Sequence, residues 1–273
     1  MHLNIVHSTH YRYDQPANRV VQALRLWPSS MPGQLVRSWK VCIDGHQLRP
    51  TCQDGYGNPA ATHTTDLALD SVQVLVEGEV ETRDLHGVVG FLDEVLPPAF
   101  FLGPTPLTAP DDAIRALAAR AQASDDDDIA QLHRLCNLVR DAIDYLPKQT
   151  HAQTRAAEAL AAGAGVCQDH THVLIAAART LGFPARYVSG YLCAEQGPNA
   201  AASHAWAEVF VTDLGWVGFD AANRICPNDL YLRIAIGRDY NDAAPVRGVR
   251  RGGGAESMEI NVNVSVGQRQ HQG

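Results

Sequence analysis

Hydrophobic and polar positions alternate along most of the first hundred residues. The clearest alternating segments are VVQALRLWP (20–28), LVRSWKVCID (35–44) and DSVQVLVEGEVE (70–81), each bounded by Gly, Pro, Asn or Asp. A period of two is typical of strands that bury one face. DGYGN at Asp54–Asn58 reads as a turn between two such strands. We therefore predict an antiparallel, β-sandwich-like domain over residues 1–105.

The pattern changes after the proline-rich segment 96–110, which disfavours both a helix and a central strand and is predicted to be a linker. Apolar residues then recur at helical spacing, which predicts four helices over 111–123, 129–144, 154–161 and the stretch from Cys167 to Leu181. Alternation returns and predicts strands over 185–192, 204–211, 215–220 and 258–266. Helices followed by strands indicate an α+β domain, here 106–273, rather than a parallel sheet.

Composition narrows the class of protein. Hydrophobic residues make up 45% of the chain and charged residues 19%, as in ordinary globular proteins. A formal charge of -8 argues against nonspecific binding to nucleic acid. No run approaches a membrane span of about 18 apolar residues. The start of the chain also lacks the pattern of a secretory signal, so a cytoplasmic location is expected.

The six cysteines form no CxxC pair, which disfavours a zinc knuckle or a disulfide framework. Five of them are expected to be plain buried thiols: Cys42, Cys52, Cys136, Cys193 and Cys226. The sixth, Cys167, stands between a glycine-rich turn and an apolar helix in GAGVCQDHTHVLIAAARTLGFP. That position is where a thiol becomes chemically useful.

A nucleophilic cysteine needs neighbours that favour the thiolate, because a free thiol is mostly protonated at neutral pH. A helix N-terminus contributes about 0.3 to 1 kcal/mol, which is at most one pKa unit. A second partner is therefore required, and SHAWAEVF supplies His204. On its strand His204, Trp206, Glu208 and Phe210 share one face, while only Ala and Val occupy the other.

Asp220 lies one strand later and completes the order of a thiol triad. The carboxylate would orient the imidazole, which takes the thiol proton and returns one to the leaving amine. The backbone N–H of Cys167 would meet the oxyanion. Contacts with the substrate are expected from four further residues: Gln168, Trp206, Asn223 and Tyr145.

Strand register decides whether this carboxylate can reach the histidine. A plain two-residue hairpin between the two strands would set His204 opposite Asn223 and turn Asp220 to the other face of the sheet. One extra residue, with a bulge at Gly215, would return Asp220 to the face of His204. The triad therefore predicts a bulge or an offset there, and Asn223 is the alternative orienting group.

The segments GVCQDHTHVLIAAARTLGFPARYVSGYL and SHAWAEVFVTDLGWVGFDAAN together resemble the core of the bacterial transglutaminase-like superfamily. HSTHYRYDQPANRVVQALRLWP resembles the β-rich N-terminal domain of its bacterial members, and GRDYNDAAPVRGV resembles their C-terminal segment. The resemblance implies a papain-like α+β fold with Cys167 as nucleophile, His204 as base and acid, and Asp220 as orienting group. It implies no metal and no organic cofactor.

The expected activity is therefore acyl transfer from an amide through a thioester, most simply as a peptidase or amidase acting on a peptide or protein. Transamidation to an amine is the alternative within this chemistry, and a noncatalytic binding module is the alternative outside it. Neither a nucleic acid nor a membrane is expected as a partner. The sequence leaves the oligomeric state open.

Three competing interpretations concern neighbouring residues. His170 lies one turn beyond the thiol and is a rival base. Together with Asp169 and His172 it suggests a metallohydrolase, although residues two apart on a helix diverge. The acidic run Asp125–Asp128 lacks the alternating spacing of a calcium loop, so a solvated loop and helix cap are favoured.

Overall fold

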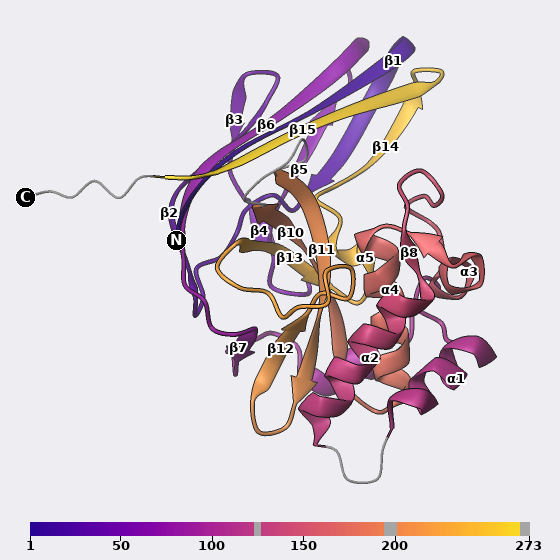
Figure 1. The fold of residues 1–273 in the computed structure, drawn as a ribbon. Coiled ribbons are helices and arrows are strands. Elements are labelled where there is room, and N and C mark those ends of the chain that lie inside the picture. The colour runs from indigo at the N-terminus through magenta and orange to yellow at the C-terminus, as the bar shows by residue number, and fades with distance from the viewer. Residues whose placement is uncertain (123–126, 194–200, 268–273) are drawn as a thin grey trace, which may run out of the picture.

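The computed structural model describes residues 1–122, 127–193 and 201–267, and builds them into two large antiparallel sheets with helices beside the second (Figure 1). The N-terminal sheet has eight strands, in which β3, β2, β6, β1, β5 and β4 follow one another and β14 and β15 add to β1. Its strands are β1 (His2–Leu24), β2 (Gln34–Ile43), β3 (His46–Leu48), β4 (Cys52–Gln53), β5 (Pro59–Thr65), β6 (Leu69–Thr82), β14 (Val246–Gly252) and β15 (Glu256–Val266).

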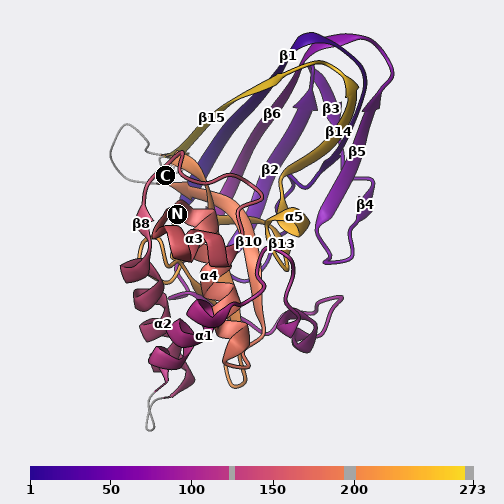
Figure 2. The same ribbon diagram turned by 90° about the vertical axis from the view of Figure 1, so that its right-hand side faces the viewer.

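The long strand β1 organises this sheet because its two halves have different neighbours. Its first half lies between β6 and β15, and its second half lies between β5 and β14. The pairing of β1 with β6 is irregular between Arg12 and Ala17, where β1 bends sharply (Figure 2). Apolar side chains from both halves of β1, and from β2, β5 and β6, meet in one cluster that includes Tyr13, Leu24 and Val74. The sheet thus folds over its own core.

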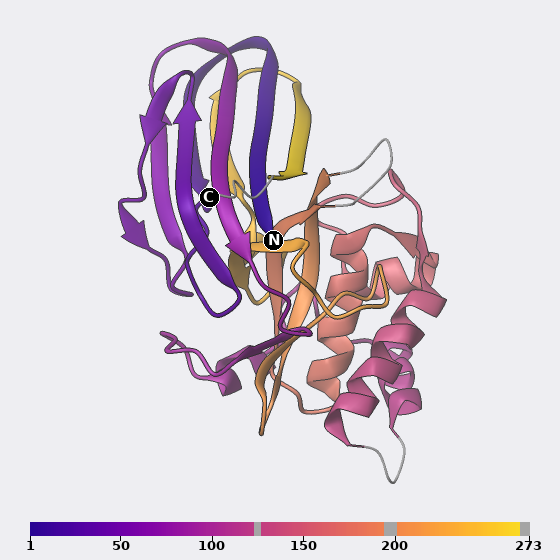
Figure 3. The ribbon, with the colours of Figure 1, turned by 60° about the vertical axis from the view of Figure 1, so that its left-hand side comes forward.

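The second sheet has the order β13, β10, β11, β12 and β7, with every pair antiparallel. Its strands are β7 (Val88–Gly90), β10 (Ala185–Cys193), β11 (Ala201–Val211), β12 (Gly215–Phe219) and β13 (Tyr231–Gly237). The helices α1 (Asp112–Ala121), α2 (Asp128–Ala142), α3 (Ala156–Ala162) and α4 (Cys167–Thr180) lie on one side of it (Figure 3). An antiparallel sheet with helices on one side confirms the predicted α+β class.

The helices begin where their polar caps predict. Asp111 accepts a hydrogen bond from the Ile114 N–H at 2.9 Å, and Asp127 accepts one from the Ala130 N–H at 2.6 Å. In the acidic run Asp127 is thus a helix cap, while Asp125 and Asp126 lie outside the described residues. Apolar faces of the helices and of β10, β11 and β12 form the largest core cluster. No helix of the described part is both long and apolar enough to cross a membrane.

The predicted division at residue 105 does not follow the sheets. Strand β7 precedes that point but pairs with β12 of the second sheet. Strands β14 and β15 come from the predicted catalytic domain, yet they pair with β1 along its length. Alternation in 258–266 identified the strand correctly but carries no information about its partner, which lies some 250 residues away in sequence.

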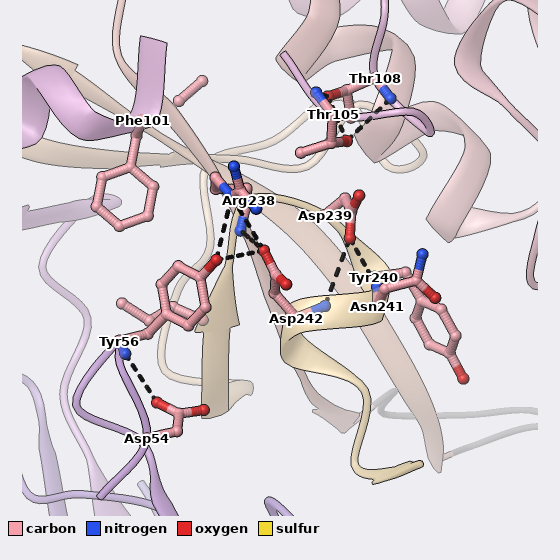
Figure 4. Close-up of polar contacts among 12 residues, drawn as sticks. Asp54, Tyr56, Phe101, Thr105, Thr108, Arg238, Asp239, Tyr240, Asn241 and Asp242 are labelled. Carbon is pink, nitrogen blue, oxygen red and sulfur yellow. Dashed lines mark hydrogen bonds and ion pairs between the residues drawn. The ribbon is translucent and has the colours of Figure 1, made fainter. Parts of the chain in front are cut away.

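The proline-rich segment is more than a linker. It forms a turn of 3-10 helix at Pro98–Leu102, and Phe101 is buried against Trp216 with 5.4 Å between ring centroids. Nearby, the hydroxyl of Tyr56 contacts both Arg238, which directly follows β13, and Asp242 of the short helix α5 (Tyr240–Ala243) (Figure 4). Tyr56 belongs to the predicted turn, which the hydrogen bond from the Asp54 N–H to the Asn58 carbonyl confirms.

Two side-chain amides from the N-terminal part close the outer edge of β13. Gln34 accepts from the Arg233 N–H at 2.9 Å and donates to the Arg233 carbonyl at 3.0 Å. Asn58 does the same for Ile236, with both distances 2.8 Å. Each amide thus supplies the donor and acceptor that a neighbouring strand would supply. This edge is therefore satisfied without another strand.

A buried ionic cluster connects the segment around Glu94 to the second sheet. Arg186 of β10 has no exposed surface and lies 2.6 Å from both Glu94 and Glu208. Glu94 also accepts a hydrogen bond from the Trp216 indole at 2.8 Å. Buried ion pairs of this kind fix geometry more than they add stability. Glu94 thereby holds its segment against the core sheet.

Candidate active site

Cys167 is the first residue of α4, as the sequence predicts. The turn before it is held by Asp169, which accepts from the Val166 N–H at 2.8 Å and from the Thr150 hydroxyl at 2.7 Å. A Cβ on Gly165 would lie 2.6 Å from an Asp169 oxygen. Glycine is therefore required there by close approach, and the thiol is delivered at the helix N-terminus, where backbone N–H groups lack intrahelical partners.

The sulfur of Cys167 interacts with two side chains that come from separate elements. One is His204, near the start of β11, and the other is Tyr145, from the two-residue strand β8 (Asp144–Tyr145). Strand β8 pairs in parallel with β9 (Ala164–Gly165), which sets Tyr145 beside Gly165, just before the nucleophile. The thiol, the imidazole and the phenol therefore meet at one point.

The predicted offset between β11 and β12 is confirmed. Val211 pairs with Gly215, so the connection has three residues, and Gly215 has a positive φ of 76°. Ala207 then pairs with Phe219, which brings Asp220 to the position opposite Trp206 and onto the face of His204. A left-handed residue closing a three-residue hairpin is the standard solution to this register, and glycine adopts it without strain.

Asp220 is buried and accepts hydrogen bonds from three side chains and, at 3.2 Å, from the Asn223 backbone N–H. His204 Nε2 lies 2.6 Å from its Oδ2, the Tyr231 hydroxyl donates at 2.7 Å, and the Asn223 amide donates at 2.7 Å. Asn223 therefore supports the carboxylate instead of replacing it as the orienting group. Because Asp220 occupies Nε2, the imidazole has Nδ1 left for the sulfur.

Burial alone would lower the pKa of His204, but its hydrogen bonds to Asp220 and Cys167 and the charges of both raise it to about 10. For Asp220 burial acts upward, while the bonds from His204, Tyr231 and Asn223 bring its pKa below the usual value. Burial, together with the neighbouring charges of Cys167 and Asp220, raises the pKa of Tyr145 to about 12. The site thus favours a protonated imidazole at His204 beside an ionised carboxylate at Asp220, and a neutral phenol at Tyr145.

The four residues expected to touch the substrate have different surroundings. Tyr145 is half-exposed beside the sulfur, which suits a donor to the substrate. Gln168 is partly exposed, and its amide donates to the Ala152 carbonyl at 3.2 Å. Trp206 is buried, lies nearly parallel to the ring of His204 and meets Tyr231 edge-on, so it supports the histidine. Asn223 binds Asp220, as described above.

Hydrogen bonds to other groups engage the side chains on which the rival base and the metal interpretation depend. His170 is buried, with Nδ1 2.9 Å from the Val166 carbonyl and Nε2 3.0 Å from the Ile143 carbonyl. His172 accepts from the Tyr240 N–H at 3.1 Å, and Asp169 holds the turn before α4. These side chains are therefore engaged separately. Within the residues described, no three His, Cys, Asp or Glu side chains are grouped to hold a metal ion.

Two features escaped the sequence. Tyr231 opens β13, a strand that was not predicted, and nothing in YLRIAIG indicates that its first hydroxyl reaches Asp220. The expectation of five buried thiols is wrong for Cys52, which is exposed, and for Cys226, which is partly exposed. Cys52 sits on a two-residue strand, too short to bury a face. The remaining three are buried.

The geometry defines a cysteine-centred site in a mixed helix and sheet core, and sequence comparison gives the same class. The family model of the transglutaminase-like superfamily matches residues 115–221, and that of the bacterial transglutaminase-like N-terminal region matches residues 3–81. The chain belongs to the transglutaminase-like superfamily and carries its bacterial N-terminal region.

Similar full-length proteins include the uncharacterized protein ML0607 of Mycobacterium leprae, 27% identical over 96% of this chain and 98% of that protein. The uncharacterized protein Rv2569c of Mycobacterium tuberculosis is 28% identical over 96% and 91%. Among solved structures, a protein of Cytophaga hutchinsonii described as a "Putative Cysteine Protease" superposes with a TM-score of 0.76 at 21% identity, covering 97% of this chain and 90% of its own. That likeness shows a shared fold.

Proposed function

We propose that the protein is a cysteine-dependent acyl-transfer enzyme that cleaves amide bonds in peptides or proteins. The single observation behind this proposal is the position of the His204 ring. Its Nε2 lies 2.6 Å from Asp220, and the ring also forms a hydrogen bond with the Cys167 sulfur, for which Nδ1 is left. An imidazole held between a carboxylate and a thiol is the arrangement that activates sulfur as a nucleophile.

In the proposed reaction the Cys167 sulfur attacks the amide carbonyl, and the carbonyl oxygen becomes an oxyanion. The backbone N–H of Cys167, at the helix N-terminus, and the Tyr145 hydroxyl, which interacts with the sulfur, would donate to that oxyanion. When the C–N bond breaks, the imidazolium of His204 gives its proton to the leaving nitrogen, and a thioester remains.

Water then attacks the thioester as His204 takes a proton from it. The acid is released and the thiol is restored. We favour water over an amine because the sequence carries no motif with the alternating spacing of a calcium loop. An amine acceptor would give a transamidated product by the same steps. Both outcomes share the first half-reaction.

The test uses a peptide library containing ordinary amides, isopeptides and side-chain carboxamides, incubated with and without cadaverine. Mass spectrometry should find hydrolysed products in both arms, and none with the Cys167→Ala variant. Products that carry cadaverine in preference to the acid would replace hydrolysis with transamidation. Equal alkylation of Cys167 and Cys52 by iodoacetamide near pH 7, together with no product, would leave the noncatalytic binding module.

A further inference from the structure

Strand β15 is a long edge strand, and several other edges of the described sheets are shorter or better protected. The outer edge of β13 is closed by Gln34 and Asn58, while β3, β4 and β7 have only two or three residues each. Strand β14 carries three arginines in seven residues. The eleven residues of β15, ESMEINVNVSV, include neither Lys nor Pro, and their pairing with β1 is regular throughout. Their two charged residues, Glu256 and Glu259, both lie in the first four positions of the strand. Natural edges of this length usually carry such protection.

The two ends of the β1–β15 ladder show which backbone groups face outward. Gly267 donates to the His2 carbonyl at 2.8 Å, and Asp14 donates to the Ala255 carbonyl at 3.1 Å. Because hydrogen-bonded pairs alternate in an antiparallel ladder, the odd-numbered residues of β15 bond to β1 and the even-numbered ones point their N–H and C=O away from it. The Val264 carbonyl agrees, since it accepts from the Cys193 thiol of β10.

The outward groups left over belong to Met258, Ile260 and Val262. Their side chains lie on the face that Val264 buries, yet Met258 is 56% exposed and Ile260 is 47% exposed. In the part of the chain that the structure describes, β15 pairs with no strand besides β1. The edge of β15 from Met258 to Val262 therefore offers unpaired backbone groups next to an exposed apolar face.

A cavity of about 310 Å³ opens beneath this stretch, between β15, β14 and β1. Tyr11, Val20, Gln22 and Met258 are among the residues that line it, and the ion pair between Arg250 and Glu256 crosses its rim at 3.2 Å. Gln22 is 3% exposed, and its Oε1 has no hydrogen-bond partner among the described residues. Besides Gln22 and that ion pair, the cavity is lined by tyrosine, aliphatic and glycine residues and by Met258. An unpaired buried acceptor in such a lining suits a large side chain that carries a donor.

The position of this edge favours a substrate over a second copy of the chain. The C-terminal half of β15 packs against β10 and β11, and β11 carries His204 (Figure 3). Five residues of strand span only about 17 Å. A ladder of that length is too small for a stable dimer, which buries at least about 1,200 Å². It is enough to orient an extended peptide by strand addition.

We propose that the Met258–Val262 edge docks the polypeptide substrate as an added strand, with one large side chain in the cavity beside Gln22. This inference rests on the proposed function and narrows its substrate class to extended polypeptide segments. Backbone bonds to β15 would supply general affinity, and the cavity would supply a side-chain preference.

The probe is a fluorescein-labelled peptide of alternating Thr and Val with one central Trp, titrated against the Cys167→Ala variant so that nothing is cleaved. Adding Ile260→Pro removes an outward N–H without touching the bonds to β1, and should weaken binding about tenfold. The matched control Ile260→Thr keeps that N–H and should stay within about threefold. Replacing the central Trp by Ala should also weaken binding.

Hydrogen exchange locates the contact. The peptide should slow exchange at Met258, Ile260 and Val262, and leave Glu259 and Asn261 as they are. Binding that is absent, indifferent to Ile260→Pro, or protective elsewhere would overturn the proposal. Sedimentation showing self-association that Ile260→Pro abolishes would assign the edge to a second copy. Selective alkylation of Cys167 needs no peptide, so its failure would contradict the proposed function and leave docking intact.

Discussion

His204 and His172 are both buried, yet their surroundings drive them to opposite protonation states. Hydrogen bonds and the charges of Asp220 and Cys167 overcome burial and raise the pKa of His204 to about 10. His172 has no exposed surface and, among the residues that the structure describes, no anionic partner, and burial, assisted by Arg179, lowers its pKa to about 3. The protonation state of a buried histidine in this protein therefore follows from the partners of its ring, and burial alone yields a neutral packing group.

Removing His204 should have the largest effect on the thiol. His204→Gln removes the imidazole that interacts with the Cys167 sulfur and that we propose as its base, so alkylation of Cys167 by iodoacetamide at pH 7 should slow about 100-fold. Peptide mapping after timed labelling measures this, with exposed Cys52 as an internal reference. The matched variant His172→Phe should label at the wild-type rate. If both variants behave alike, the contrast between the two histidines is wrong.

Asp220→Asn should have the second largest effect on the alkylation rate of Cys167, because it keeps the shape of the side chain and removes its charge. The pKa of His204 should fall, and alkylation of Cys167 at pH 7 should slow about tenfold. The pH profile of alkylation separates this effect from unfolding, since its midpoint shifts while the circular dichroism spectrum does not. An unchanged profile would mean that the carboxylate has no influence on the ring.

The two histidines should also give opposite pH dependences of stability. The folded pKa of His172 lies below its usual 6.5, so its neutral form stabilises the protein above that pH, and this contribution is lost as pH falls toward 3. The folded pKa of His204 lies above 6.5, so its contribution is complete below that pH and is lost as pH rises toward 10. Each group acts on its own side of neutrality.

Urea unfolding at a series of pH values tests this sign difference. His172→Phe should flatten the loss of stability on the acid side, although His7, whose pKa burial lowers to about 4, keeps some slope there. His204→Gln should flatten the alkaline side. A variant that changes the slope on the wrong side of neutrality would contradict the assigned state of its histidine.

Tyr231→Phe should have the smallest effect of the series. It removes one of three side-chain donors to Asp220 and leaves His204 and Asn223 in place, so the free energy of unfolding should fall by about 1 kcal/mol. The alkylation rate of Cys167 should change by less than about fivefold. A loss as large as that of His204→Gln would make Tyr231 essential to the reaction.

Local pattern predicted much of this site. The glycine-rich turn before an apolar helix predicted the position of Cys167 at a helix start, and alternation predicted His204 on a strand. Because side chains alternate between the two faces of a sheet, Asp220 could share the face of His204 only with the offset found at Gly215. Each of these follows from neighbours in sequence.

Long-range pairing explains what the sequence did not show. The hydroxyl of Tyr231 reaches Asp220 because β13 lies next to β10 and the chain returns to the site, which no local period encodes. The pairing of β15 with β1 brings together the two ends of the chain. The contact of His170 Nε2 with the Ile143 carbonyl likewise depends on the path of a segment 27 residues away.

The most direct measurement is an NMR titration of the His204 ring in the wild type and in the Cys167→Ala variant. The wild-type ring should remain an imidazolium well above pH 8, and loss of the sulfur should lower its pKa measurably. A ring that titrates near pH 6.5 in both proteins would show that the imidazole does not feel the sulfur.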